Sequence, residues 1–209
     1  MVALRAIVAK LRNRKFTVAE AAAMTGISVQ QVNNLLDEIV PLGLAHAGNR
    51  KRELEYRGLF ILPLACDLAK AEIPPNLRKK ALQAALESPK NKHITITGTN
   101  LLVRIDNYRV QVSYGLTQLY LAEESVSSSP EIMQGEPCIR GTRIPVYVVA
   151  KLANVHGAEE ALATYSTLSK QQVADAQLFA VAKPRRGAPK KIALPVAGHK
   201  VPKVFRRKK

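Results

Sequence analysis

The stretch TVAEAAAMTGISVQQVNNLLDEIV, residues 17–40, decides how the first part of this chain is expected to fold. It begins with a threonine that has a glutamate three places later, which is the capping-box signature and predicts a helix over residues 18–24. Ser28 and Gln31 repeat the signature and predict a second helix, which ends before Pro41. A short helix, a turn that contains glycine and a longer helix make the helix-turn-helix layout.

The segments on either side extend this layout to residues 1–64. Apolar side chains at helical spacing predict a further helix over residues 4–12. Residues 42–62 resemble two strands around a basic turn, which predicts a β-hairpin beside the helix pair. We therefore predict a winged helix-turn-helix domain. A small helical domain that binds no DNA is the alternative.

The second helix of the pair offers polar side chains that suit a DNA groove. Its apolar residues recur on one face, which leaves uncharged amides on the other, and Gln and Asn can each form paired hydrogen bonds with an adenine edge. Basic residues before the helices and at the hairpin tip are placed for phosphate contacts. A merely solvated polar face is the alternative. The predicted DNA-binding residues are Ser28, Gln30, Gln31, Asn33, Asn34, Arg12, Arg14, Lys15, Arg50, Lys51 and Arg52.

The chain beyond this domain is expected to hold a helix and a sheet. Residues 74–87 predict an amphipathic helix. Residues 92–121 alternate with a period of two and predict a small antiparallel sheet that turns at Asp106 and Asn107. We assign both to one segment, residues 65–128.

Residues 129–182 are expected to form a compact domain of three helices. The predicted helices cover residues 146–155, 158–165 and 170–182, and Ser169 is the expected N-cap of the last. The predicted fold class is α+β, mainly α.

Most of the positive charge is concentrated at the end of the chain. The formal net charge is +16, and residues 183–209 hold eleven Lys and Arg with no acid, which contributes +11 of it. Such a segment cannot bury enough apolar surface to offset its loss of conformational entropy. We predict a disordered basic tail that binds a polyanion or an acidic protein groove.

The residues that enzymes use are absent or scattered. The four histidines have no metal-ligand spacing, and no glycine-rich phosphate loop is present, so we expect no catalytic residue, metal or cofactor. Cys66 and Cys138 are far apart, which favours reduced thiols in a cytoplasmic protein. Cys138 is expected to be a small buried residue, with a reactive thiol as the alternative. No run of 18 apolar residues predicts a membrane span.

The stretch PEIMQGEPCIRGTRIPV, residues 130–146, carries a specific motif, Gly-x-Pro-x-Ile-x-Gly-Thr-Arg-Ile-Pro-Val. With the helices behind it, residues 129–182 closely resemble a widespread prokaryotic domain of unknown function that occurs as the antitoxin of VapB-like toxin–antitoxin pairs. Ser166 departs from the usual proline of that family. The amino-terminal part looks like the DNA-binding domain of the longer antitoxins of this group.

The resemblance implies a partner and a function. The partner would be a PIN-type ribonuclease toxin, which holds divalent metal with clustered carboxylates that antitoxin arginines or lysines can occupy. A non-enzymatic antitoxin of this kind also represses its own operon, as a homodimer on palindromic operator DNA. The alternative is a stand-alone nucleic-acid-binding transcription regulator, because the tail suits nucleic acid equally well.

The implied toxin contacts lie in the motif and the tail. Gly135 and Gly141 are expected to permit tight turns, and Pro145 to start a helix. Arg143 is expected to tie the loop to carbonyls or an acid, which leaves Arg140 as the less fixed arginine. The expected toxin-binding residues are Arg140, Arg143, Lys183, Arg185, Arg186, Lys190, Lys191, Lys203, Phe205, Arg206 and Arg207.

Overall fold

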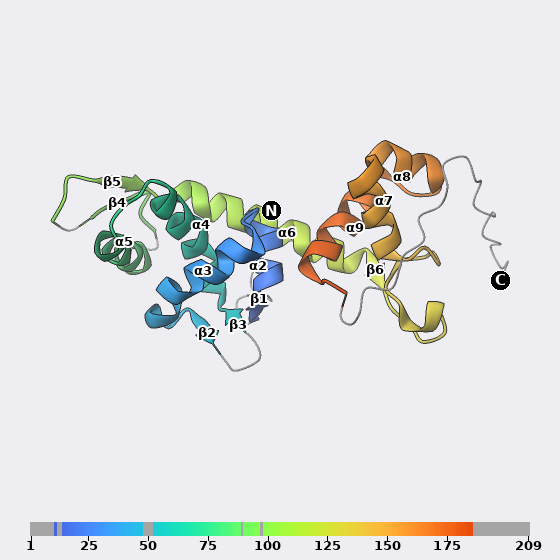
Figure 1. Cartoon of the computed structure of the whole chain (residues 1–209), viewed down its shortest axis with the longest axis horizontal. Coiled ribbons are helices and arrows are strands. Elements are labelled where there is room, and N and C mark those ends of the chain that lie inside the picture. The colour runs from blue at the N-terminus through green and yellow to red at the C-terminus, as the bar shows by residue number, and fades with distance from the viewer. Residues whose placement is uncertain (1–10, 12–13, 48–51, 89, 97, 186–209) are drawn as a thin grey trace. The chain divides into compact units, whose positions relative to one another are not determined.

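A computed structural model describes residues 11, 14–47, 52–88, 90–96 and 98–185 (Figure 1). The described part is mainly helical with small antiparallel sheets, as predicted. The chain divides into two compact units, Met1–Tyr120 and Leu121–Lys209. No helix among the described residues is long and apolar enough to cross a membrane. The predicted disorder of residues 186–209 and most of the predicted helix over residues 4–12 lie outside the described residues.

The first unit begins with the predicted helix pair and a three-stranded sheet. Thr17 and Ser28 cap the two helices, and each has the reciprocal bond of a capping box. Gly26 makes the turn between the helices with a φ of 71°. The antiparallel sheet has the strand order β1-β3-β2. The elements are β1 (Phe16–Thr17), α2 (Val18–Thr25), α3 (Val29–Ile39), the 3-10 turn η1 (Val40–Leu42), β2 (Ala45–Ala47) and β3 (Arg52–Leu54).

The hairpin is shorter than predicted, because α4 (Tyr56–Lys70) begins where the second strand was expected to continue. The run LFILPLAC within it is apolar throughout, and periodicity does not distinguish a buried strand from a buried helix. Its leucines are buried by neighbouring elements. The predicted boundary between residues 64 and 65 therefore falls inside a helix. A second predicted helix follows as α5 (Pro75–Glu87).

The predicted sheet over residues 92–121 is only partly present. Its first half forms β4 (His93–Thr95) and β5 (Leu102–Arg104), which pair antiparallel. The second half is wrong, because residues from Asp106 onward form the 19-residue helix α6 (Asp106–Glu124). Val112 is buried but Val110 is 70% exposed, so the alternation of apolar residues there does not mark the two faces of a strand.

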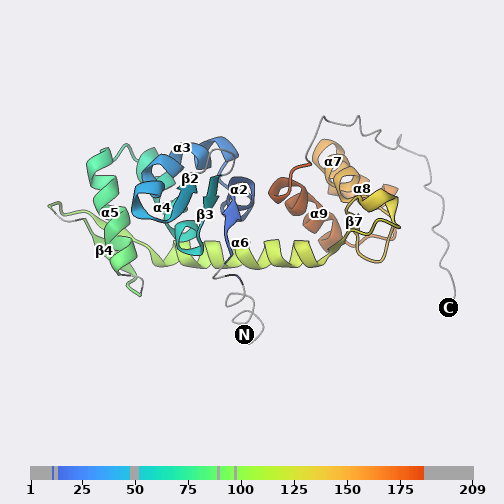
Figure 2. The ribbon, with the colours of Figure 1, turned by 90° about the horizontal axis from the view of Figure 1, so that it is seen from below.

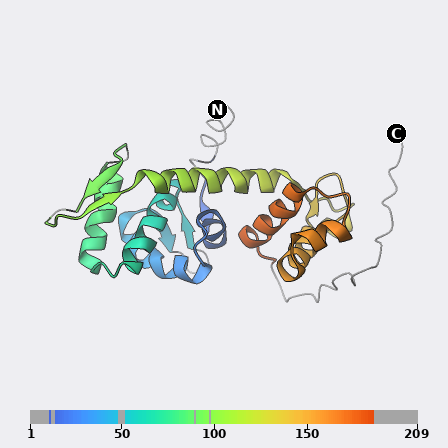
Figure 3. The same cartoon turned by 90° about the horizontal axis from the view of Figure 1, so that it is seen from above.

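The helix α6 packs along α2 and α4 in the first unit (Figures 2 and 3). An ideal Cβ built on Gly115 would lie 2.1 Å from the carbonyl oxygen of Met24 at the end of α2. Gln111 donates a hydrogen bond of 3.1 Å to the carbonyl oxygen of Thr25. Tyr108 donates one of 2.9 Å to Asp67 of α4. Gln111 and Gly115, which contact the end of α2, are four residues apart and so lie on one face of a helix.

The second unit contains the predicted three helices and a short strand pair. Val126 and Ile139 pair in its antiparallel sheet, and both lie in the core with apolar residues of the three helices. Ser169 caps the last helix with a capping box, as predicted. The elements are β6 (Val126–Ser127), the 3-10 turn η2 (Met133–Gly135), β7 (Cys138–Ile139), α7 (Val146–His156), α8 (Ala158–Thr164) and α9 (Lys170–Ala182).

Candidate nucleic-acid and partner interfaces

The helix α3 presents an uncharged amide face beside its apolar one. Gln30, Gln31 and Asn34 are exposed, and Asn33 is half-buried. The opposite face packs into the core of the first unit through Val32, Leu35, Leu36 and Ile39. The first half of α3 is therefore available to a partner along its polar side.

Two of these amides are already committed to the helix itself. Gln31 accepts a bond of 3.3 Å from the backbone N–H of Ser28 as part of the capping box. The amide nitrogen of Asn33 donates a bond of 3.0 Å to the carbonyl oxygen of Val29. Gln30 and Asn34 make no side-chain hydrogen bond within the described part of the chain, and their i, i+4 spacing places them on one face. They are the amides best able to bind base edges.

The second half of α3 is acidic and tied to neighbouring elements. Arg52 of β3 donates a bond of 3.1 Å to the carbonyl oxygen of Asn33 and lies 3.8 Å from Asp37. Arg78 of α5 pairs with Glu38 at 2.5 Å. Both carboxylates of α3 are thus engaged with arginines, and its first half, which carries no acid, is the part suited to a nucleic acid.

The predicted phosphate contacts have different environments. Lys15 is exposed, and Arg52 keeps part of its guanidinium exposed while it joins the hairpin to α3. Arg12, Arg50 and Lys51 lie outside the described residues.

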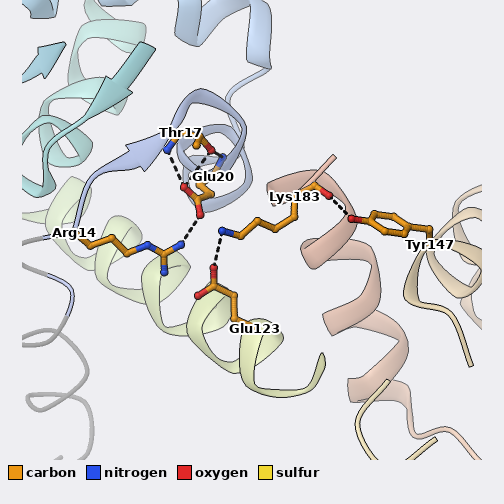
Figure 4. A network of polar contacts seen from close by, with 6 residues as sticks. All are labelled: Arg14, Thr17, Glu20, Glu123, Tyr147 and Lys183. Atoms are coloured by element: carbon orange, nitrogen blue, oxygen red, sulfur yellow. Dashed lines mark hydrogen bonds and ion pairs between the residues drawn. The ribbon is translucent and has the colours of Figure 1, made fainter. Parts of the chain in front are cut away.

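Arg14, which is a predicted phosphate contact, also binds groups within the first unit. Its guanidinium pairs with Glu20, whose exposed fraction is 2% (Figure 4). Glu20 also accepts a bond of 2.8 Å from the backbone N–H of Thr17. The guanidinium carbon of Arg14 lies 5.2 Å from the centre of the Phe16 ring. Removing Arg14 would take a paired cation away from a buried carboxylate, and a role in stability follows.

The motif of residues 130–146 forms a strap that leads into the helices of the second unit. Gly135 and Gly141 have φ values of 83° and 77°, which only glycine adopts without strain, as predicted. Thr142 closes the second turn, because its hydroxyl donates a bond of 2.8 Å to the carbonyl oxygen of Ile139. Pro145 is the N-cap of α7. The strap supplies Ile139 to the core of the second unit.

The two arginines of the motif have roles opposite to those expected. Arg140 is the fixed one: its Nε donates a bond of 2.5 Å to the carbonyl oxygen of Glu124 at the end of α6, and its backbone N–H donates one of 2.8 Å to Ser125. A cationic donor on the last carbonyls of a helix is a C-terminal cap. Arg143 is exposed and makes no hydrogen bond or ion pair within the described residues. Arg143 is therefore the motif arginine better placed for a partner.

Cys138 is a buried residue of the strap, with an exposed fraction of 1%. Its thiol donates a bond of 3.3 Å to the carbonyl oxygen of Glu136. Burial, assisted by the nearby Glu136 carboxylate, raises the pKa of the Cys138 thiol. A reactive cysteine needs the opposite shift, because the thiolate is the nucleophile.

The first residues of the predicted tail are packed on the second unit, which corrects the expectation of disorder from residue 183. Lys183 pairs with Glu123 at 3.2 Å, and its carbonyl oxygen accepts a bond of 2.7 Å from the Tyr147 hydroxyl (Figure 4). Arg185 pairs with Glu136 at 2.8 Å, and its guanidinium carbon lies 5.7 Å from the centre of the Tyr147 ring. Two of the expected toxin contacts thus bind acids of their own unit.

The remaining tail residues expected to bind a toxin lie outside the described residues. They are Arg186, Lys190, Lys191, Lys203, Phe205, Arg206 and Arg207. Within the described residues, no group of three or more His, Cys, Asp and Glu side chains is arranged to hold a metal ion.

Residues 126–180 match the model of a family described as "Protein of unknown function (DUF433)". This segment is therefore similar to a family whose function is not known. The matched segment contains the strap, the strand pair and almost all of the three helices, so the match coincides with the core of the second unit.

Most of the chain is also similar to a bacterial protein. It is 29% identical over 189 residues to "Uncharacterized protein y4eO" of Sinorhizobium fredii, and the match covers 81% of each chain. The similarity to this relative therefore extends beyond residues 126–180 into the first unit. No solved structure matches this chain.

Proposed function

We propose that this protein is a DNA-binding antitoxin, which represses its own operon and inhibits a PIN-type ribonuclease toxin in the cytoplasm. The observation that carries the DNA-binding half is the exposed pair Gln30 and Asn34 on the first half of α3. The toxin-inhibiting half rests on the resemblance of the strap and its helices to antitoxins, and on the cationic end of the chain.

The helix pair and hairpin supply what a winged helix-turn-helix needs. In such domains the second helix enters the major groove and its first residues contact base edges. In α3 these are the residues that carry amides without charge, whereas the acids lie in the second half. Arg52 of the hairpin contacts α3, and it supports phosphate contacts together with the exposed Lys15.

The test of DNA binding is fluorescence anisotropy with a labelled duplex from upstream of the gene, beside a scrambled duplex. Gln30→Ala and Asn34→Ala should each weaken specific binding by about 1–3 kcal/mol, or roughly 5- to 150-fold, and leave scrambled DNA unaffected. Gln83→Ala is the matched control, because Gln83 is an exposed amide of α5. Equal operator affinity in all three variants would refute this use of α3.

The inhibitory half assigns the tail cations and Arg143 to the acidic metal centre of the toxin. Guanidinium groups form paired bonds with carboxylates and compete directly with a metal ion. Lys183 and Arg185 are not assigned this role, because each pairs with an acid of its own unit. The test is co-purification with the product of the neighbouring gene, followed by a nuclease assay. Full nuclease activity in excess antitoxin would refute inhibition.

A homodimer is part of the proposal, because a palindromic operator needs two copies. Residues 110–120 of α6 contain no charged side chain, and Val110 and Tyr114 are 70% and 67% exposed. In a chain of net charge +16, an uncharged face is where two copies meet without repulsion. Tyr114→Glu should give a monomer in light scattering after size exclusion. Val155→Glu, at an exposed apolar position of α7, is the control and should stay dimeric.

The second candidate function is a stand-alone transcription regulator whose tail clamps phosphates, which the cationic tail favours. Removal of residues 186–209 distinguishes the two. If the tail binds DNA, its removal reduces the salt dependence of DNA affinity by several charges. If it binds a toxin, DNA affinity stays and inhibition is lost.

A further inference from the structure

The first unit contains a pocket of about 270 Å³ between α4, α5 and the beginning of α6. These elements lie side by side in the views of Figures 1 and 3. The pocket is open to solvent and comes from residues that are far apart in the sequence. Its lining residues are Tyr56, Arg57, Phe60, Ile61, Ala85, Leu86 and Arg109.

The lining combines an apolar wall with two cations. Phe60 packs edge-on against Tyr56, with ring centres 4.9 Å apart, and aliphatic side chains complete the wall. Arg57 is exposed, and Arg109 is held by a hydrogen bond of 3.2 Å to the carbonyl oxygen of Ser88. No acid is among the lining residues. An apolar pocket with a few convergent polar groups is the usual form of a small-molecule site.

We propose that this pocket binds a small organic anion, namely a carboxylate on a flat apolar ring. The ring would lie against Phe60 and the aliphatic wall, and the carboxylate would pair with Arg57 and Arg109, because guanidinium groups match carboxylates in shape and charge. The volume equals that of about nine water molecules, so it suits a ligand of roughly ten to fifteen non-hydrogen atoms.

The pocket is also coupled to the candidate DNA-reading helix, and this step rests on the proposed function. The helix α5 forms one wall of the pocket and carries Arg78, which pairs with Glu38 of α3 at 2.5 Å. The side chains of this pair are 17% and 29% exposed, so water screens it incompletely. A ligand that shifts α5 against α4 therefore changes the position of α3, and the site acts as an effector site.

The test uses 2-naphthoate as the probe, titrated into the full chain and followed by its fluorescence and by equilibrium dialysis. We expect saturable binding with a Kd between about 10 µM and 1 mM, which is the range for a ligand of this size. Arg57→Gln should raise the Kd about tenfold or more, because it removes a charged hydrogen bond. The neutral analogue 2-naphthamide should bind wild type correspondingly less well. Lys80→Gln is the control, an exposed cation of α5 outside the pocket.

Two results would overturn the site: no saturable binding, or equal affinity of wild type and Arg57→Gln for 2-naphthoate. Leu86→Trp provides a second variant that fills the pocket and should abolish binding of both probes, with circular dichroism as the check on folding. The coupling predicts that 2-naphthoate changes operator affinity in both proteins, but that Arg57→Gln needs about tenfold or more of the ligand for the same change. Ligand binding with unchanged operator affinity would refute the coupling. Absence of any operator binding would instead refute the proposed function, since ligand binding is measured independently.

Discussion

Gly115→Ala should destabilise the first unit, although alanine is the better helix former. Gly115 lies inside α6, where replacing glycine by alanine ordinarily contributes about 1 kcal/mol of stability. Here the added Cβ would lie 2.1 Å from the carbonyl oxygen of Met24, whereas ordinary contact begins at 3.4 Å. The difference of these two distances means that α6 and α2 must separate by more than 1 Å.

The expected loss follows from the contacts that this separation disturbs. Overpacking of a close contact costs typically about 1–3 kcal/mol. The bond of 3.1 Å from Gln111 to Thr25 would lengthen, which costs about 1 kcal/mol more. After the gain in helix propensity, the net loss is about 2 kcal/mol, or a fall of about 8 °C in the Tm of a unit of this size.

The assay is thermal unfolding of the full chain, followed by circular dichroism at 222 nm and by calorimetry, which can separate the transitions of the two units. Ser113→Ala is the matched control in the same helix, and it should not lower the Tm. If Gly115→Ala melted at or above the wild-type temperature, the close approach of α6 to α2 would be refuted.

Three further predictions concern charged and titrating groups. Arg140→Gln should lower the free energy of unfolding in urea by about 1 kcal/mol, because the Arg140 side chain donates to carbonyls at the end of α6. Arg143→Gln is the control and should change this free energy little. Equal effects of the two substitutions would contradict the role of Arg140 as a cap. The Cys138 thiol should be alkylated slowly at neutral pH and faster as pH rises, because burial raises its pKa. Rapid alkylation at pH 7, measured by mass spectrometry, would show an exposed thiolate and contradict this. The variant Cys138→Ala should keep DNA binding. The hydrogen bond from Arg104 lowers the pKa of Asp106 to about 2, so the Asp106 carboxyl should titrate near pH 2 by NMR. The stability that this pair contributes is complete above the unfolded-state pKa of Asp106 and is lost as pH falls through the folded-state pKa. In Arg104→Gln the midpoint should move up toward 3.8.

The elements that the sequence predicts correctly are those set by residues three or four apart. Thr17, Ser28 and Ser169 each form the capping box that their spacing predicts, so the starts of α2, α3 and α9 are local properties of the chain. Gly135 and Gly141 likewise make turns because their backbone conformations need no distant partner.

The spacing of apolar residues predicted the wrong secondary structure where the segment is surrounded by other elements on several sides. Residues 59–66 of α4 are apolar throughout, and Val110 and Val112 in α6 alternate by chance with polar neighbours. Gly115 is a helix-breaking residue in isolation, and only its contact with Met24 makes glycine necessary there. These segments are helices because of what they pack against.

The same distinction holds for the candidate sites. Composition alone shows a basic chain with an amide-rich helix, and it places Gln30 and Asn34 on one face because helical spacing is fixed. It does not show that Arg14 is held by Glu20, that Arg140 caps a helix, or that Arg57 and Arg109 line one pocket. Whether a charge is available to a partner depends on which groups of its own chain bind it. That depends on residues far apart in the sequence, which the tertiary structure alone brings together.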